Sequence, residues 1–146
     1  MAQLNRSKHV WARASAKQEK IAKSLTCHHL VPKSRGGSAG ARNILRLAWD
    51  KHQSWHKLFK NKTIMEVLEL LLQEARFEKK PFTSKRFQLV RWDKLQSWHC
   101  LFKERSSTEA LELLVKMVWL KGYHSLSCTY VQELDKLKSE KLECTG

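Results

Sequence analysis

Hydrophobic and polar positions divide the start of the chain into an arm and two short extended segments. Residues 1–25 are polar and basic, and we expect a short helix around residues 11–24 of this arm. Residues 26–31 form an extended stretch that ends at a proline and a glycine pair, both of which favour turns. Apolar residues resume in NILRLAW, residues 43–49, where the pattern predicts a strand or a bent segment.

From Asp50 onward the pattern becomes helical, and Asp50 itself is expected to cap the first helix. Amphipathic helices are predicted over residues 64–79 and 107–120. Each opens with a capping box, in which a hydroxyl side chain and a glutamate three residues later bond to each other's backbone N–H groups. The boxes are Thr63 with Glu66 and Ser106 with Glu109. The last segment, VQELDKLKSEKLE, predicts a charged helix whose single weak apolar stripe serves packing or an oligomer contact.

The two helical regions are copies of one sequence. Residues 49–71 and residues 92–114 are identical at 15 of 23 positions, with no gap and a constant offset of 43. Each copy is therefore expected to form a helix–turn–helix unit, and the second copy to pair with the first or to widen its binding surface. The segment before the first copy, CHHLVPKSRGG, has no counterpart before the second.

Positive charge is concentrated in the first part of the chain. The chain has 28 Lys and Arg against 14 Asp and Glu, a net charge of +14. Residues 1–60 hold 13 basic and 2 acidic residues, so +11 of this charge lies there and +3 in residues 61–146. Such asymmetry indicates a polyanionic partner, most often nucleic acid, because phosphate neutralisation drives binding. A generic basic surface is the alternative explanation.

Composition argues against several other classes of protein. No apolar run is long enough to span a membrane, and no long amphipathic helix gathers basic residues on one face for a membrane surface. Four scattered cysteines without a C-x-x-C pair lead us to expect reduced thiols and a cytoplasmic, reducing compartment. At 146 residues, the chain is expected to form one domain or two very small ones.

Four histidines offer metal and proton chemistry. His52 and His56 stand at i and i+4 of a predicted helix, which places both imidazoles on one face. This spacing is common for two ligands of one cation, although such a pair also occurs without any ligand. His28 and His29 are adjacent on an extended segment, so they point to opposite faces and one of them can supply a third ligand. The other can then face a substrate as a general base.

The spacing of these histidines resembles the HNH motif of the His-Me finger nuclease superfamily, in the colicin-like HH…N…H…H variant. The resemblance covers residues 26 to about 60, with an asparagine 14 residues after the second histidine and 9 before the third. Its residues are His28, His29, Pro32, Gly36, Gly37, Asn43, His52 and His56. Many members of the superfamily have an aspartate in place of the first histidine, and zinc-knuckle cysteines that this chain lacks.

The resemblance implies a role for each of five residues. His28, His52 and His56 would hold one divalent metal ion. His29 would take a proton from the attacking water, a step for which imidazole is suited because it titrates near neutral pH. Asn43 would tether the loop after the first strand and orient the base. Three imidazoles favour Zn²⁺ or Ni²⁺, whereas turnover in this family often runs with Mg²⁺ or Mn²⁺, so the identity of the ion stays open.

Basic residues around this motif are expected to contact nucleic-acid phosphates. They are Lys33, Arg35, Arg42, Arg46, Lys51 and Lys57. Trp49 and Trp55 could stack on bases, but they recur as Trp92 and Trp98, and this repetition favours core packing. Cys27 is expected to be a small buried thiol.

The second copy lacks most of these chemical groups. It keeps His99 at the position of His56 but has Leu95 in place of His52, and no double histidine precedes it. It is therefore not expected to form a second metal centre, and His99 is expected to be a structural histidine.

These features together predict a mainly helical α+β fold, in which a ββα-metal element is followed by helices and a degenerate second repeat. The expected segments are a basic N-terminal arm (1–25), an HNH ββα-metal unit with its following helix (26–80), a degenerate repeat unit without the metal site (81–121) and a charged helical tail (122–146).

The leading functional hypothesis is a metal-dependent endonuclease that hydrolyses phosphodiester bonds, with DNA expected in preference to RNA. The alternative is a non-catalytic nucleic-acid-binding protein, associated with ribosomes or phage assembly, that keeps the fold as a scaffold. The complete motif favours the enzyme, because a binder would be free to lose the base. An inhibitor of another nuclease is a third hypothesis. A protein partner or a second copy of the chain could bind through the second repeat or the C-terminal helix.

Overall fold

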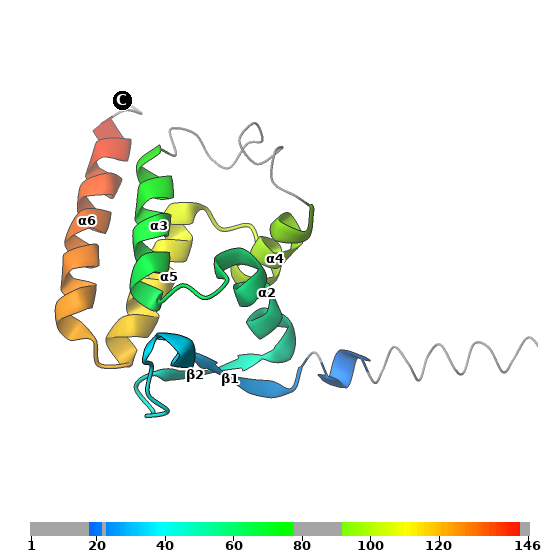
Figure 1. Cartoon of the computed structure of the whole chain (residues 1–146). Coiled ribbons are helices and arrows are strands. Elements are labelled where there is room, and N and C mark those ends of the chain that lie inside the picture. Colours follow the sequence, from blue (N-terminus) through cyan, green and yellow to red (C-terminus); the bar gives the residue numbers. More distant parts are fainter. Residues whose placement is uncertain (1–17, 22, 78–91, 144–146) are drawn as a thin grey trace, which may run out of the picture.

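In the described part of the chain, a two-stranded antiparallel hairpin packs on a helix and is followed by four further helices. The computed structural model describes residues 18–21, 23–77 and 92–143. The elements are β1 (Leu25–His29), β2 (Ile44–Ala48), α2 (Trp49–Phe59), α3 (Ile64–Phe77), α4 (Trp92–Phe102), α5 (Ser107–Leu120) and α6 (His124–Glu143). Figure 1 shows the hairpin at one end, with α3, α5 and α6 side by side above it and α2 next to α4. This confirms the predicted α+β, mainly helical fold.

The hairpin brings one face of β1 against α2. Leu25 lies opposite Ala48 and His29 opposite Ile44, so both strands are paired along their whole length. Within β1, Cys27 is exposed and His28 is buried, as expected when alternate side chains point to opposite faces. The two extended segments predicted from the sequence therefore both form strands.

The loop between the strands depends on two glycines. A short 3-10 helix (Lys33–Arg35) ends at Gly36, whose φ of 82° lies in the left-handed region that favours glycine. A Cβ atom on Gly37 would lie 1.7 Å from the carbonyl oxygen of Val31, which leaves no room for any other residue there. The Gly-Gly pair therefore allows the loop to fold back tightly on the end of β1.

Helix α2 begins two residues earlier than a cap at Asp50 would place it, because its first residue is Trp49 and not Lys51. β2 leads directly into α2, and the backbone N–H of Trp49 donates to the carbonyl oxygen of Ser24 at 2.9 Å. The residue before the helix is Ala48, which has no capping side chain. The prediction that Asp50 caps the helix is therefore wrong. Asp50 lies in the first turn, where its carboxylate accepts a hydrogen bond from the N–H of Lys51 at 2.8 Å.

Both predicted capping boxes are present. The N–H of Thr63 donates to the Glu66 carboxylate at 2.7 Å, and the Glu66 N–H donates to the Thr63 hydroxyl at 3.4 Å. Ser106 and Glu109 exchange the same two bonds at the start of α5. The helix predicted over residues 107–120 is confirmed. The one predicted over residues 64–79 is confirmed from Ile64 to Phe77, and residues 78–79 lie outside the described residues.

The helix expected around residues 11–24 lies mostly outside the described residues. Residues 18–21 are helical, and Lys23 and Ser24 form a turn and a bend that lead into β1.

Each helix of the first sequence copy packs on the equivalent helix of the second copy. α2 packs on α4, and α3 packs on α5. Trp55 and Phe59 of the first copy and Trp98 and Phe102 of the second belong to one buried core. The tail helix α6 packs on α5, and the weak apolar stripe of its sequence is buried in part, since Val131 and Leu142 are exposed. Its buried apolar residues are Tyr130, Leu134 and Leu137.

None of the helices in the described ranges is long and apolar enough to cross a membrane.

Candidate metal centre

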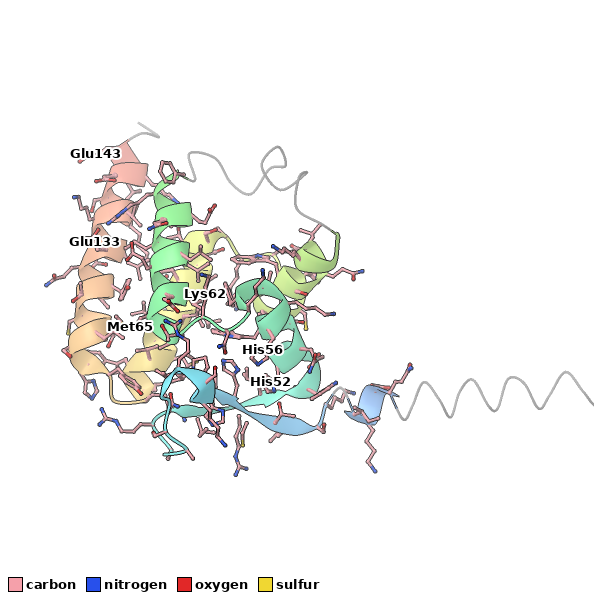
Figure 2. The ribbon with its side chains drawn as sticks, viewed as in Figure 1. His52, His56, Lys62, Met65, Glu133 and Glu143 are labelled. Carbon is pink, nitrogen blue, oxygen red and sulfur yellow. The ribbon has the colours of Figure 1, made fainter. Side chains whose placement is uncertain are left out.

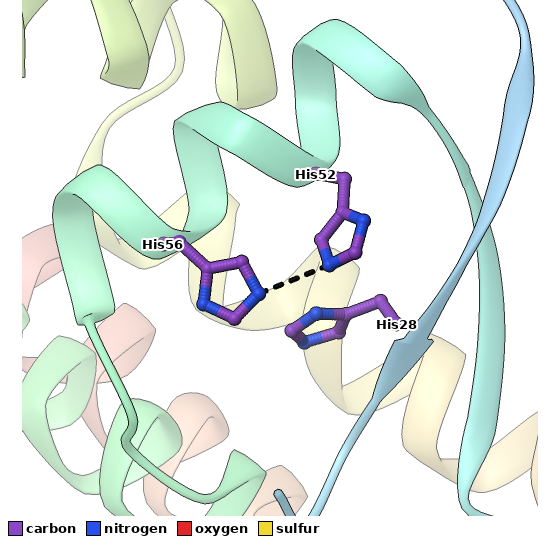
Figure 3. Close-up of side chains that lie close together, drawn as sticks. All are labelled: His28, His52 and His56. Carbon is purple, nitrogen blue, oxygen red and sulfur yellow. Dashed lines mark hydrogen bonds between the residues drawn. The ribbon is translucent and has the colours of Figure 1, made fainter.

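Three histidines from two elements converge beside the hairpin. His28 comes from β1. His52 and His56, labelled in Figure 2, come from successive turns of α2. Each can offer one ring nitrogen, and these three atoms all lie within 4.8 Å of one another. Figure 3 shows the three rings pointing toward a common centre. The predicted grouping of these histidines is therefore present in the structure.

The hydrogen bonds of Thr26 fix the orientation of the His52 ring. Thr26 lies two residues before His28, on the same face of β1. Its hydroxyl group donates to the carbonyl oxygen of Leu47 at 3.0 Å, which uses its only proton. The Nδ1 atom of His52 lies 2.9 Å from the same hydroxyl oxygen, so Nδ1 must be the donor in this contact. The Nε2 atom of neutral His52 then carries a lone pair.

A backbone carbonyl group fixes His56 in the same way. Its Nδ1 atom lies 3.1 Å from the carbonyl oxygen of Lys60. A carbonyl oxygen can only accept, so Nδ1 carries the hydrogen and Nε2 carries a lone pair. Lys60 ends α2 with a φ of 53°, the left-handed region that non-glycine residues seldom adopt. Both histidines of α2 are thus held as the tautomer that leaves Nε2 available.

The two available nitrogens face each other. Nε2 of His52 and Nε2 of His56 lie 3.0 Å apart. Two lone pairs at this distance repel, and a shared cation, either a proton or a metal ion, would relieve this repulsion. Two imidazole nitrogens on one tetrahedral Zn²⁺ would lie roughly 3.3 Å apart, given bonds of about 2.0–2.1 Å. The observed spacing is close to this value.

His28 completes the cluster from a buried position. Its side chain is 3% exposed, and neither ring nitrogen has a hydrogen-bond partner among the described residues. The ring packs on Trp55, with the ring centres 4.9 Å apart. Burial is the main reason that the pKa of His28 falls to about 3, and the neighbouring rings of His52 and His56 lower it further. A buried, neutral imidazole with no partner is a suitable metal ligand.

The neutral form of the His52 ring is favoured as well. Burial lowers the pKa of His52, and so do the nearby rings of His56 and His29. Metal binding requires neutral imidazole, so these shifts keep ligands available in mildly acidic solution. The three side chains fit a divalent transition metal, and the cluster could hold such an ion.

His29 directly follows His28 on β1, and Asn43 directly precedes β2. His29 ends β1 and is half-buried, and its Nε2 atom is shielded from solvent without a partner in the described ranges. The side chain of Asn43 is 4% exposed and ties the loop together. Its oxygen accepts from the N–H of Val31 at 2.7 Å, and its amide group donates to the carbonyl oxygens of Val31 and Ser38 at 3.0 and 2.7 Å.

The six basic residues expected to contact phosphates are all exposed but differ in their surroundings. Arg35 pairs with Glu66 and lowers the pKa of that carboxyl group to about 2. Arg42 donates to the carbonyl oxygen of Gly122 at 2.6 Å and lies over the ring of Tyr123. The other four form no ion pair with a described side chain; they are Lys33, Arg46, Lys51 and Lys57.

Two side-chain predictions are wrong. Trp49 is 41% exposed and is not a core residue, whereas Trp55 and Trp98 are buried as predicted. Trp49 lies six residues before Trp55, about 240° around the helix, and so it points away from the face that α4 covers. Cys27 is exposed, because it points to the face of the hairpin opposite His28. The Trp92 side chain lies outside what the structure describes.

Thr26 and the carbonyl group of Lys60 are the parts of the site that the sequence interpretation missed. Two spacings could have revealed them. Thr26 shares a strand face with His28 at i and i+2, and Lys60 follows His56 by one helical turn. Such outer groups commonly fix the tautomer of metal-binding histidines.

A β-hairpin followed by a helix with a histidine cluster is compatible with a ββα-metal motif. Comparison of the chain with models of known protein families, with curated protein sequences and with solved structures gives no match. The chemistry of the site itself must therefore support any assignment of function.

Proposed function

We propose that the chain is a metal-dependent endonuclease of the HNH type that hydrolyses phosphodiester bonds in nucleic acid, with duplex DNA as its main substrate. The observation that carries this proposal is the convergence of three imidazoles at the junction of the hairpin and α2. Two of them present Nε2 lone pairs 3.0 Å apart, and the third is buried without a hydrogen-bond partner among the described residues.

Each group of the site has a proposed part in the reaction. His28, His52 and His56 would hold the ion, which when bound would stabilise the negative charge that develops on the phosphate and on the departing oxygen. His29 would accept a proton from the attacking water. Asn43 would hold the loop, and thereby the end of β1, so that His29 keeps its position.

The proposed reaction is a simple hydrolysis. The water oxygen forms a bond to phosphorus, and the bond from phosphorus to one sugar oxygen breaks. One proton of the water passes to His29, which returns it to solvent, and the other stays on the new phosphate oxygen. The departing sugar oxygen takes a proton from solvent water.

Charge supports a nucleic-acid substrate. The first 60 residues carry +11, and Lys33, Arg46, Lys51 and Lys57 are exposed without an ion pair to a described side chain. These four side chains are the first candidates for phosphate contacts, since Arg35 and Arg42 already have partners within the chain. Phosphate contacts of this kind position a duplex without reading its sequence.

The second candidate is a nucleic-acid-binding protein without catalysis. It is favoured by the shielded position of His29 Nε2, which is buried although a general base must reach water. In this case the metal centre would stabilise the fold, and the basic surface would bind nucleic acid alone.

One experiment separates the two candidates. The protein is incubated with plasmid DNA and with structured RNA, in EDTA and with each of Mg²⁺, Mn²⁺, Zn²⁺ and Ni²⁺. We expect cleavage that EDTA abolishes, and His29→Ala should slow it by about 10²–10⁴-fold while leaving metal affinity nearly intact. Binding without cleavage under every condition would establish the non-catalytic candidate.

A further inference from the structure

The two sequence copies are arranged as the two halves of a symmetric dimer are. Like elements meet, with α2 on α4 and α3 on α5. Equivalent residues also meet, since Phe59 and Phe102 are 43 positions apart and their rings lie 6.4 Å from each other. Both copies end their first helix in the same unusual way, with a positive φ at Lys60 and at Lys103. Self-complementary contacts of this kind are typical of a two-fold axis.

The surface through which the copies pair is closed within the chain. Trp55 and Phe59 of the first copy are each 3% exposed, and Trp98 and Phe102 of the second are 7% and 2% exposed. A second chain therefore cannot pair with the histidine-bearing copy through α2 in the way that the second copy does.

Possible metal-ligand side chains are distributed unequally between the two copies. The second copy has Leu95 where the first has His52, and residues 72–94 contain no histidine or cysteine. Its His99 is exposed and takes no part in the cluster of His28, His52 and His56.

Positive charge, in contrast, is kept at three matching positions. Lys94, Lys103 and Arg105 stand where the first copy has Lys51, Lys60 and Lys62, and all six side chains are exposed. The second copy thus lacks two of the three histidines of the cluster but has basic side chains that can contact phosphates.

We propose that the chain acts on duplex DNA as a pseudo-dimer, two paired copies with a single metal centre, in which the hairpin and the first copy cut the DNA and the second copy only holds it. The strands of a duplex are related by two-fold axes, which a symmetric dimer with two centres can match. A pseudo-dimer with one centre reaches one strand in each binding event, so its product is a nick. This inference rests on the proposed nuclease function.

The order of products from a supercoiled plasmid tests the inference. With the wild-type chain and the divalent ion that supports cleavage, open-circular DNA should accumulate first. Linear DNA should appear only after a lag, because it needs a second, independent nick in the opposite strand. Linear and open-circular DNA formed together from the start, in a ratio that persists on dilution of the protein, would overturn the inference. Intact plasmid with every ion would instead refute the proposed nuclease function.

A charge variant tests the holding role separately. Replacing Lys94, Lys103 and Arg105 with alanine should weaken duplex binding and flatten the dependence of log K on log[salt] by about 2.7, if each contacts one phosphate. Metal affinity should not change. The control is Lys136→Ala, Lys138→Ala and Lys141→Ala on α6, outside both copies, which removes the same charge. Equal weakening by both triple variants would show that the second copy has no special contact with the duplex.

Discussion

At the scale of single residues, the orientation of two imidazole rings decides the chemistry of the site. The hydroxyl group of Thr26 has one proton, which goes to Leu47, so His52 must donate to it through Nδ1. The carbonyl group of Lys60 imposes the same tautomer on His56. The spacing predicted that His52 and His56 group with one of His28 and His29, and the resemblance to the HNH motif implied His28. The sequence could not predict the tautomers, because these depend on the register between β1 and β2 and on the end of α2.

The role of Thr26 can be measured through metal affinity. Thr26→Val keeps the shape of the side chain but removes the acceptor of His52, and we expect it to weaken Zn²⁺ binding by about 10–100-fold. Thr26→Ser keeps the hydroxyl group and should bind nearly as the wild type does. Isothermal titration calorimetry measures both, with Thr129→Val on α6 as the control. Wild-type Zn²⁺ affinity in Thr26→Val, or an equal loss of affinity in Thr26→Ser, would show that the Thr26 hydroxyl group does not orient His52 for metal binding.

The burial of His28 predicts that the metal-free protein loses stability in acid. Its pKa is about 3 in the folded chain, against about 6.5 for an unperturbed histidine. Between these values the unfolded chain binds a proton that the folded chain does not. The free energy of unfolding therefore falls as the pH is lowered below about 6.5.

Urea unfolding in EDTA at about pH 7 and about pH 5 measures this loss, whose limit for one proton is about 1.4 kcal/mol per pH unit. His28→Leu should make the free energy of unfolding depend less on pH, and the exposed His99→Leu should not. A dependence that is the same in all three proteins would show that His28 is not the group responsible.

At the scale of elements, features that depend on local sequence were predicted better than features that depend on contacts between elements. The capping boxes at Thr63 and Ser106 lie within one helical turn, and both helices begin where these boxes place them. The start of α2 was missed because the carbonyl group of Ser24, distant in sequence, satisfies the N–H of Trp49. Repetition alone gave no information on burial, since Trp49 is exposed while Trp55 is buried.

The pairing of α2 with α4 is expected to account for much of the stability of the fold. Phe102 is 2% exposed and contacts both Trp98 and Phe59. Phe102→Ala should lower the free energy of unfolding by about 3–5 kcal/mol, the usual cost of deleting a buried aromatic ring. Leu120 is 84% exposed, so Leu120→Ala should change it by less than about 0.5 kcal/mol. Chemical denaturation of the two variants checks this, and similar values for both would contradict the proposed weight of the α2–α4 contact.

At the scale of the whole molecule, the two sequence copies pair with each other, and only one of them contributes to the candidate metal centre. The hairpin contributes His28 and helix α2 of the first copy contributes His52 and His56, and all three lie within the first 60 residues, which carry +11 of the net charge of +14. The second copy supports α2 and α3 through α4 and α5. The repeat was evident in the sequence, but its pairing could not be deduced from it, because the same repeat could also have stacked in a row.

The central claim is that His28, His52 and His56 bind one divalent metal ion. A calorimetric titration of the metal-free chain with Zn²⁺ tests this most directly, with His52→Ala, His56→Ala and His99→Ala as variants. We expect about one ion per wild-type chain and an unchanged result for His99→Ala. His52→Ala and His56→Ala should each weaken binding by more than about 100-fold, beyond the effect of losing an outer-shell partner. Wild-type affinity in these two variants, or a loss that appears only in His99→Ala, would contradict the assignment of the metal centre.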